Sequence, residues 1–225
     1  YTLVSPYAEA DLFQVKFTQS ADVMYLFHPL YLTRKLTRRS DTKWSCVPLK
    51  YLDGPYMTTN ATTTTLTPGA ATGNAITMTA SSVVGINGGD GFKTTDVNRL
   101  IRLKEGSVWG WCRIVGRTST TVVTVDIAST LTNITAKATW RLGLYSDTTG
   151  WPAAGTFHED RLVTLGNTSE PERGDTSKTA DYETYGPSDM DGTVTDSHGV
   201  TFTMRSDDVQ VIRWVKSDEK GLLVG

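Results

Sequence analysis

Short runs of alternating hydrophobic and polar residues dominate the first 51 positions of the chain. In residues 12–18, Phe13, Val15 and Phe17 would share one face of a strand, with polar side chains on the other. Three further strand-like runs follow at 22–28, 32–37 and 43–47. Four antiparallel strands with tight turns in about 40 residues have the size of one β-propeller blade, and they fit a meander in a β-sandwich equally well.

A change in pattern after residue 56 predicts an inserted domain. Thr, Ala and Gly become frequent, and strand-like runs recur between Gly-rich corners. We expect strands at 75–80, 99–103, 107–115, 120–126 and 138–142. Strands of this density favour a small β-barrel or curled sheet.

The last third of the chain returns to the first pattern. Residues 156–165 predict a strand pair, 166–181 an exposed polar loop, and 200–204, 209–215 and 221–225 further strands. The resulting organisation is a propeller-like segment 1–56, the inserted barrel 57–143, and a second propeller-like segment 144–225. Because the chain opens on Tyr1 and ends in a strand-like run, we expect it to continue beyond residue 225.

Composition supports an all-β protein and excludes several classes. About one residue in six is Thr, there are 20 Gly residues, and helix formers rarely recur at helical spacing. The net charge of −2 disfavours a basic nucleic-acid-binding domain, and no apolar run approaches the roughly 18 residues of a membrane span. Cys46 and Cys112 are interpreted as buried free thiols, with a disulfide as the alternative.

Several stretches outside residues 58–138 carry a resemblance to a known family. They are 5–12, 19–25, 28–29, 34–38, 144–152, 157–162, 212–215 and 222–225. Together they resemble phage and prophage tail nozzle proteins, also called tail tubular or stabilisation proteins, of short-tailed phages. Such proteins often contain an insert that is similar to the first catalytic-cysteine half-domain of ubiquitin-activating enzymes.

The resemblance implies a β-propeller platform in a phage tail, made in the bacterial cytoplasm and built into the virion. Its expected partners are identical subunits, commonly six in a ring, and neighbouring tail proteins. Phage DNA would pass through the ring without sequence-specific binding. For the insert the resemblance implies a fold alone, because the adenylation machinery that ubiquitin activation needs has no trace in this sequence.

The most reactive-looking residues are His158 and Asp160, which would share one face of a strand. A hydrolytic or metal site there would need more ligands or a paired motif such as HExxH. The sequence has neither, and its other histidines, His28 and His198, lie in turn-like contexts. We therefore interpret this cluster as a polar strand edge, with a hydrolase as a weaker hypothesis.

Two other motifs invite a ligand, and neither predicts a cofactor or metal. Residues 85–91 are Gly-rich but lack the spacing and the Lys of a phosphate-binding loop, so we expect a turn. Residues 189–196 begin like a calcium loop but lack the Glu at its twelfth position.

A basic run and a pair of tryptophans are the remaining candidates for contact with a partner. Arg34, Lys35, Arg38 and Arg39 form the one positive cluster, and on a strand their charges would fall on both faces. They fit a solvated edge strand that resists edge-to-edge pairing, or a phosphate or subunit contact.

Trp109 and Trp111 would lie on one face of a strand. Exposed, they could stack on sugar rings, as in a carbohydrate-binding adhesion module of a phage tail; buried, they would belong to the barrel core. The sequence as a whole favours a structural virion component that acts by subunit assembly without catalysis. The adhesion module is the alternative function.

Overall fold

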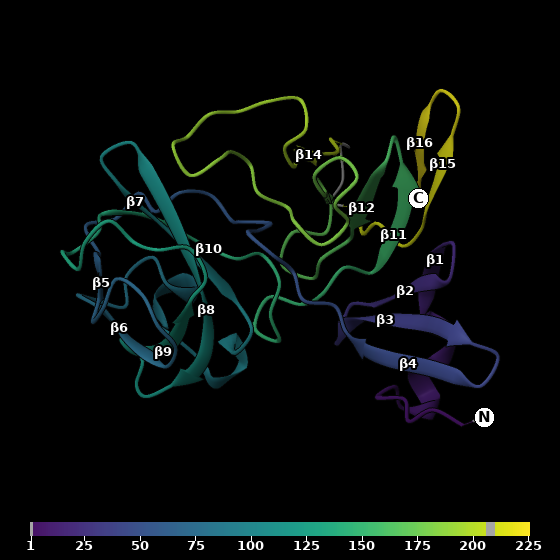
Figure 1. Cartoon of the computed structure of the whole chain (residues 1–225), viewed down its shortest axis with the longest axis horizontal. Helices are drawn as coiled ribbons and strands as arrows, with labels where there is room; N and C mark the ends of the chain where they lie inside the picture. The colour runs from purple at the N-terminus through teal and green to yellow at the C-terminus, as the bar shows by residue number, and fades with distance from the viewer. Residues whose placement is uncertain (1, 206–209) are drawn as a thin grey trace. The chain divides into compact units, whose positions relative to one another are not determined.

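The computed structural model describes residues 2–205 and 210–225, and it is mostly β, with 43% strand and 5% helix. Four antiparallel sheets make up the fold (Figure 1). The chain divides into two compact units. Unit 1 comprises Tyr1–Leu52, Thr149–Gly186 and Ser197–Gly225, and unit 2 comprises Asp53–Thr148 and Pro187–Asp196. The prediction of an all-β protein is confirmed, whereas the described residues form no propeller.

The first sheet of unit 1 is the four-stranded meander expected from the alternating runs. Its strands pair in chain order: β1 (Lys16–Ser20), β2 (Val23–His28), β3 (Tyr31–Ser40) and β4 (Lys43–Pro48). Two-residue turns connect each strand to the next, so neighbouring strands in the chain are also neighbours in the sheet.

The prediction of a strand over residues 12–18 is wrong in its first half. A 3₁₀ helix, η1 (Glu9–Gln14), precedes β1, and the ring of Phe13 is 95% exposed. The phenolic hydroxyl of Tyr31 donates a 2.6 Å hydrogen bond to Asp11 and accepts one from the backbone of Ala8, which fixes the helical turn against β3. This tertiary contact overrides the local alternation.

A second four-stranded meander follows in unit 1. It consists of β11 (Ala154–His158), β12 (Arg161–Leu165), β13 (Arg173–Thr176) and β14 (Thr201–Thr203), again in chain order. The expected exposed loop at 166–181 is therefore wrong, because β13 lies inside it and its Arg173, Gly174 and Asp175 are buried. The Arg173 guanidinium and the Asp175 carboxylate form a 2.8 Å ion pair, so this strand buries a charge pair in place of the apolar side chains that would reveal it.

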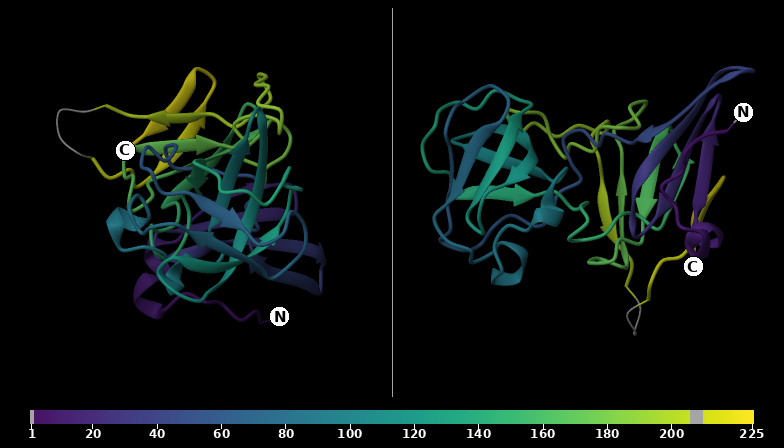
Figure 2. Two further views of the ribbon diagram at one scale, coloured as in Figure 1. Left: turned by 90° about the vertical axis from the view of Figure 1, so that its left-hand side faces the viewer. Right: turned by 90° about the horizontal axis from the view of Figure 1, so that it is seen from below.

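The two meanders of unit 1 stack face to face (Figure 2, right). The Phe27 ring lies against Gly155, and the rings of Tyr25 and Phe157 meet edge to face at 5.8 Å. Phe27 is fully buried, so this contact forms the centre of the stacked sheets.

A hairpin of β15 (Val215–Asp218) and β16 (Gly221–Val224) packs on the other face of the second meander, around Val163, Leu165 and Ile212. The predicted strand at 209–215 is wrong over 210–214, which are irregular, and residue 209 lies outside the described residues. The predicted strand at 221–225 is confirmed for Gly221–Val224.

Unit 2 is built on one curled sheet, a half-barrel, whose strands follow the order β10-β7-β8-β9-β6-β5 (Figure 2). The strands are β5 (Leu66–Pro68), β6 (Ile76–Ala80), β7 (Leu100–Glu105), β8 (Val108–Arg117), β9 (Val122–Ile127) and β10 (Thr139–Leu142). Fourteen buried apolar residues, Trp140 and Cys112 among them, form its core. An isolated bridge joins Leu66 of β5 to Lys137, just before β10.

Candidate functional site

Trp109 lies on the outer face of the half-barrel, under three cationic side chains. The charged groups of Arg102, Lys104 and Arg141 lie 4.9, 5.4 and 5.4 Å from its ring centroid. The strand register explains this cluster, because Trp109 pairs with Lys104 across the β7–β8 ladder. Trp109 is only 9% exposed, so its ring has little free face on which a sugar could stack.

The segment Pro187–Asp196 covers part of this face, although it is distant in sequence. The Trp109 backbone N–H donates to the carbonyl of Met190, and Arg102 donates to the carbonyl and the hydroxyl of Ser188 at 2.9 and 3.0 Å. Arg102 also lies 3.5 Å from the carboxylate of Asp53. The hydrogen bonds and the ion pair of this network thus engage Arg102 and Trp109 within unit 2. Trp111 is half-buried.

Three cations of the basic run on β3 are engaged inside unit 1. Lys35 forms an ion pair with Glu183, and Arg34 donates to the Cys46 carbonyl at 3.2 Å. Arg38 forms ion pairs with Asp41 and, at 3.9 Å, with Asp22. Arg39 is exposed. Acidic partners thus neutralise Lys35 and Arg38, which favours a role within the unit over a phosphate contact.

His158 and Asp160 do not share a strand face, so that prediction is wrong. Glu159 and Asp160 form the β11–β12 turn, with φ of 48° and 55°. The His158 Nδ1 lies 2.9 Å from the Ser217 hydroxyl of β15. The imidazole therefore links two sheets of unit 1, and the carboxylate that would complete a hydrolytic pair lies in the turn.

The remaining motifs have structural explanations within the described part of the chain. Residues 85–91 contain the short helix η2 (Asn87–Gly89), in which Asn87 donates to the Asp96 carboxylate. In the calcium-like segment, the Asp191 carboxylate accepts a hydrogen bond from the Thr193 backbone. Residues 2–205 and 210–225 contain no cluster of three metal-ligating side chains and no helix that is long and apolar enough to cross a membrane.

Both cysteines are free thiols, as interpreted from the sequence. Cys112 is fully buried in the half-barrel core, and burial raises the pKa of its thiol far above the ordinary value. Cys46 is only half-buried, so the expectation of two buried thiols holds for Cys112 alone.

The strongest candidate for a functional surface is the outer face of the first meander. Side chains of paired residues lie on the same face of a sheet, and Tyr25 faces the second meander. The opposite face of the first meander, here called the open face, carries apolar side chains on all four strands. They are Phe17, Met24, Leu26, Leu36, Trp44 and Cys46, and the same register places Gln19, Arg34 and Arg38 on this face.

The open face is incompletely covered. Phe17 is 65% exposed and the other five residues are partly exposed. The segment before β1 approaches one end of the sheet, where Tyr7 contacts His28 and Tyr31. Exposed apolar side chains that extend over four strands beside cations favour an interaction site.

Sequence reasoning missed the charge pairs buried in the fold. Arg99 and Asp96, 3.0 Å apart, are at most 1% exposed, and Arg102 is buried beside Asp53. The sequence did contain a signal for such a pair. Arg102 lies between the apolar residues of β7, and a charge buried in such a strand needs a partner of opposite charge.

Comparison with models of known protein families found no match, and neither did a search of curated protein sequences. The candidate site therefore rests on the geometry of the chain itself.

Proposed function

We propose that this chain is a structural component of a phage tail, a part of its nozzle or tube platform, that acts by assembly without catalysis. The observation that carries the proposal is the stacking of sheets in unit 1. Its two meanders and its hairpin pack face to face, and their first strands are neighbours: β11 lies beside both β1 and β15. Successive sheets with adjacent first strands are the arrangement that a β-propeller repeats around its axis.

The open face supports assembly through one more sheet contact. The second meander is covered on both faces, by Tyr25 and Phe27 on one side and by the β15–β16 hairpin on the other. The first meander is packed against a sheet on one face only, and its open face carries exposed apolar side chains beside the cations Arg34 and Arg38. Packing a further sheet on this face would bury Phe17 and its apolar neighbours, as the existing contact buries Phe27 against Gly155.

In this proposal the partners are identical subunits in a ring together with neighbouring tail proteins, and phage DNA passes through without specific recognition. The half-barrel of unit 2 would be an insert of structural character. A carbohydrate-binding adhesion module is less well supported, because the three cations and the 187–196 segment occupy the surroundings of Trp109.

The test is size-exclusion chromatography coupled to light scattering, over chain concentrations from about 5 to 300 μM. We expect the mass to rise with concentration and Phe17→Asp to abolish that rise, because the substitution removes the most exposed apolar ring of the open face and puts a carboxylate that would lose its hydration in its place. Val194→Asp is the matched control, since Val194 is also an exposed apolar residue (70%) but lies in unit 2.

A chain that stays monomeric at every concentration would contradict assembly through the open face. If that monomer bound host-surface glycans on an array, and Trp111→Ala removed the binding, the adhesion module would replace the proposed function.

A further inference from the structure

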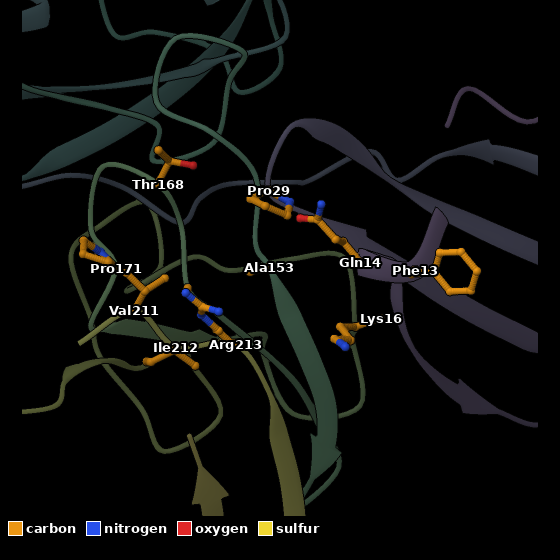
Figure 3. A pocket seen from close by; sticks show the side chains of 11 residues that line it. Phe13, Gln14, Lys16, Pro29, Ala153, Thr168, Pro171, Val211, Ile212 and Arg213 are labelled. Atoms are coloured by element: carbon orange, nitrogen blue, oxygen red, sulfur yellow. The ribbon is translucent and has the colours of Figure 1, made fainter. Parts of the chain in front are cut away.

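Unit 1 contains a cavity that the proposed assembly does not use. Its volume is about 670 Å³, within the range of roughly 300–1,000 Å³ found for small-molecule sites. Figure 3 shows side chains from two ends of the sequence on opposite sides of it: Gln14 and Lys16 on one side, and Val211, Ile212 and Arg213 on the other.

The cavity lies where the three sheets of unit 1 begin. Lys16 is the first residue of β1, Ala153 immediately precedes β11, and Arg213 comes two residues before β15. The β2–β3 turn contributes Pro29, and the β12–β13 loop contributes three further lining residues, Gly166, Thr168 and Pro171. Because β11 lies between β1 and β15, the strand starts gather at one end of the stack and line the cavity, which is open to solvent.

The lining combines an apolar wall with two cations. Ala153, Pro171 and Ile212 provide apolar surface, and Ile212 is only 2% exposed. The side chains of Lys16 and Arg213 are exposed to solvent, and neither forms an ion pair with any residue in the described ranges.

None of the described residues that line the cavity is a carboxylate. Among residues 2–205 and 210–225, the lining therefore carries the positive charges of Lys16 and Arg213 with no negative side chain beside them. Exposed cations beside an apolar cavity favour a ligand with an anionic group at one end of an apolar body. The anionic group can form an ion pair with the cations, and the apolar body is removed from water inside the cavity.

We propose that this cavity binds a small amphipathic carboxylate, with its apolar body against Ala153, Pro171 and Ile212 and its carboxylate between Lys16 and Arg213. The inference goes beyond the proposed function, since assembly through the open face requires no ligand.

The test is a titration of the ¹⁵N-labelled chain with octanoate, followed by amide chemical shifts. Octanamide, which has the same length and no charge, is the matched ligand. We expect saturable shifts at Ala153, Gly166, Thr168 and Ile212 with both ligands, and a dissociation constant at least tenfold lower for octanoate. Inorganic phosphate, which has charge without an apolar body, should leave these amides unshifted.

Two variants separate the charge from the cavity. The double substitution Lys16→Gln and Arg213→Gln should bring octanoate to the affinity of octanamide, whereas the control Arg39→Gln, an exposed cation elsewhere in unit 1, should change neither. Ala153→Leu should fill the cavity and remove both ligands, and the dispersion of the amide spectrum reports whether each variant is folded.

Equal affinity for octanoate and octanamide in the unmodified chain would overturn the proposal. So would shifts confined to residues outside the lining, or octanoate binding that the double substitution leaves intact. Failure of assembly through Phe17 leaves these outcomes unaffected, so the two proposals are tested independently.

Discussion

The ring of Phe27 rests directly on the backbone of Gly155. A Cβ atom added at Gly155 would lie 2.7 Å from Cε2 of Phe27 and closer still to Cζ. One sheet thus presents a bare glycine so that the neighbouring sheet can bury an aromatic ring, and the separation of the two meanders depends on this pair.

Gly155→Val should force the meanders of unit 1 apart. We expect a loss of about 1–3 kcal/mol in the free energy of unfolding, the usual cost of overpacking a filled core. Urea unfolding followed by the indole N–H signals of Trp151 in unit 1 and Trp140 in unit 2 measures the loss in each unit. Adding Phe27→Leu should recover part of it in unit 1, and purely additive effects would contradict the contact.

Asp96 is expected to hold the core-flanking loops of unit 2 together. Its carboxylate accepts from the guanidinium of Arg99 at 3.0 Å, from the amide of Asn87 at 2.7 Å and from the Lys93 backbone at 2.8 Å. Asp96→Ala leaves the Arg99 charge buried without its carboxylate and should destabilise unit 2 by about 3–5 kcal/mol.

The same Trp140 signal measures this effect. Asp90→Ala is the matched control, because Asp90 pairs with Lys93 at the exposed surface and its loss should cost less than about 1 kcal/mol. Comparable losses for both variants would show that the burial of the Asp96–Arg99 pair has no energetic consequence.

His28 should make the stability of unit 1 depend on pH. Burial lowers the pKa of this imidazole below its ordinary value of 6.5, and the nearby Asp11 offsets only part of that effect. As the pH falls below about 6.5, His28 takes up a proton in the unfolded chain before it does so in the folded chain. The contribution of His28 to the free energy of unfolding is therefore highest above pH 6.5 and decreases as the pH falls toward the lowered pKa of the folded state.

The unfolding free energy at pH 7.5 and 5.5 measures this effect. We expect His28→Gln, which keeps an acceptor for the Leu30 backbone N–H, to lose less stability between the two pH values than the unmodified chain does. An equal loss in both proteins would show that the His28 imidazole is not the group responsible.

Trp109 and Trp111 should differ in their contribution to stability despite their shared strand face. Trp109→Ala removes a buried ring that contacts three cations and should cost about 3 kcal/mol or more in unit 2. Trp111→Ala, at a half-buried position, should cost less than half as much. Urea unfolding of the two variants provides the comparison, and equal losses would contradict the network around Trp109.

The local pattern of hydrophobic, polar and turn-forming residues predicted much of the β architecture. The turns between the four strands of the first meander, and the density of strands between residues 75 and 142, depend on residue chemistry within a few positions. Alternation and turn residues express that chemistry directly. The same pattern failed at residues 9–14, where a contact between Tyr31 and Asp11, twenty positions apart, stabilises a helical turn instead.

Pairings between distant residues could be decided only by the tertiary structure. The polar sequence of β13 predicted an exposed loop, because its burial depends on the ion pair between Arg173 and Asp175 and not on apolar side chains. The cavity has no signature in the sequence, since Lys16 and Arg213 are ordinary surface cations until three strand starts gather around them. A sequence reports what each residue prefers locally, whereas burial, charge pairing and enclosure arise from neighbours that only folding brings together.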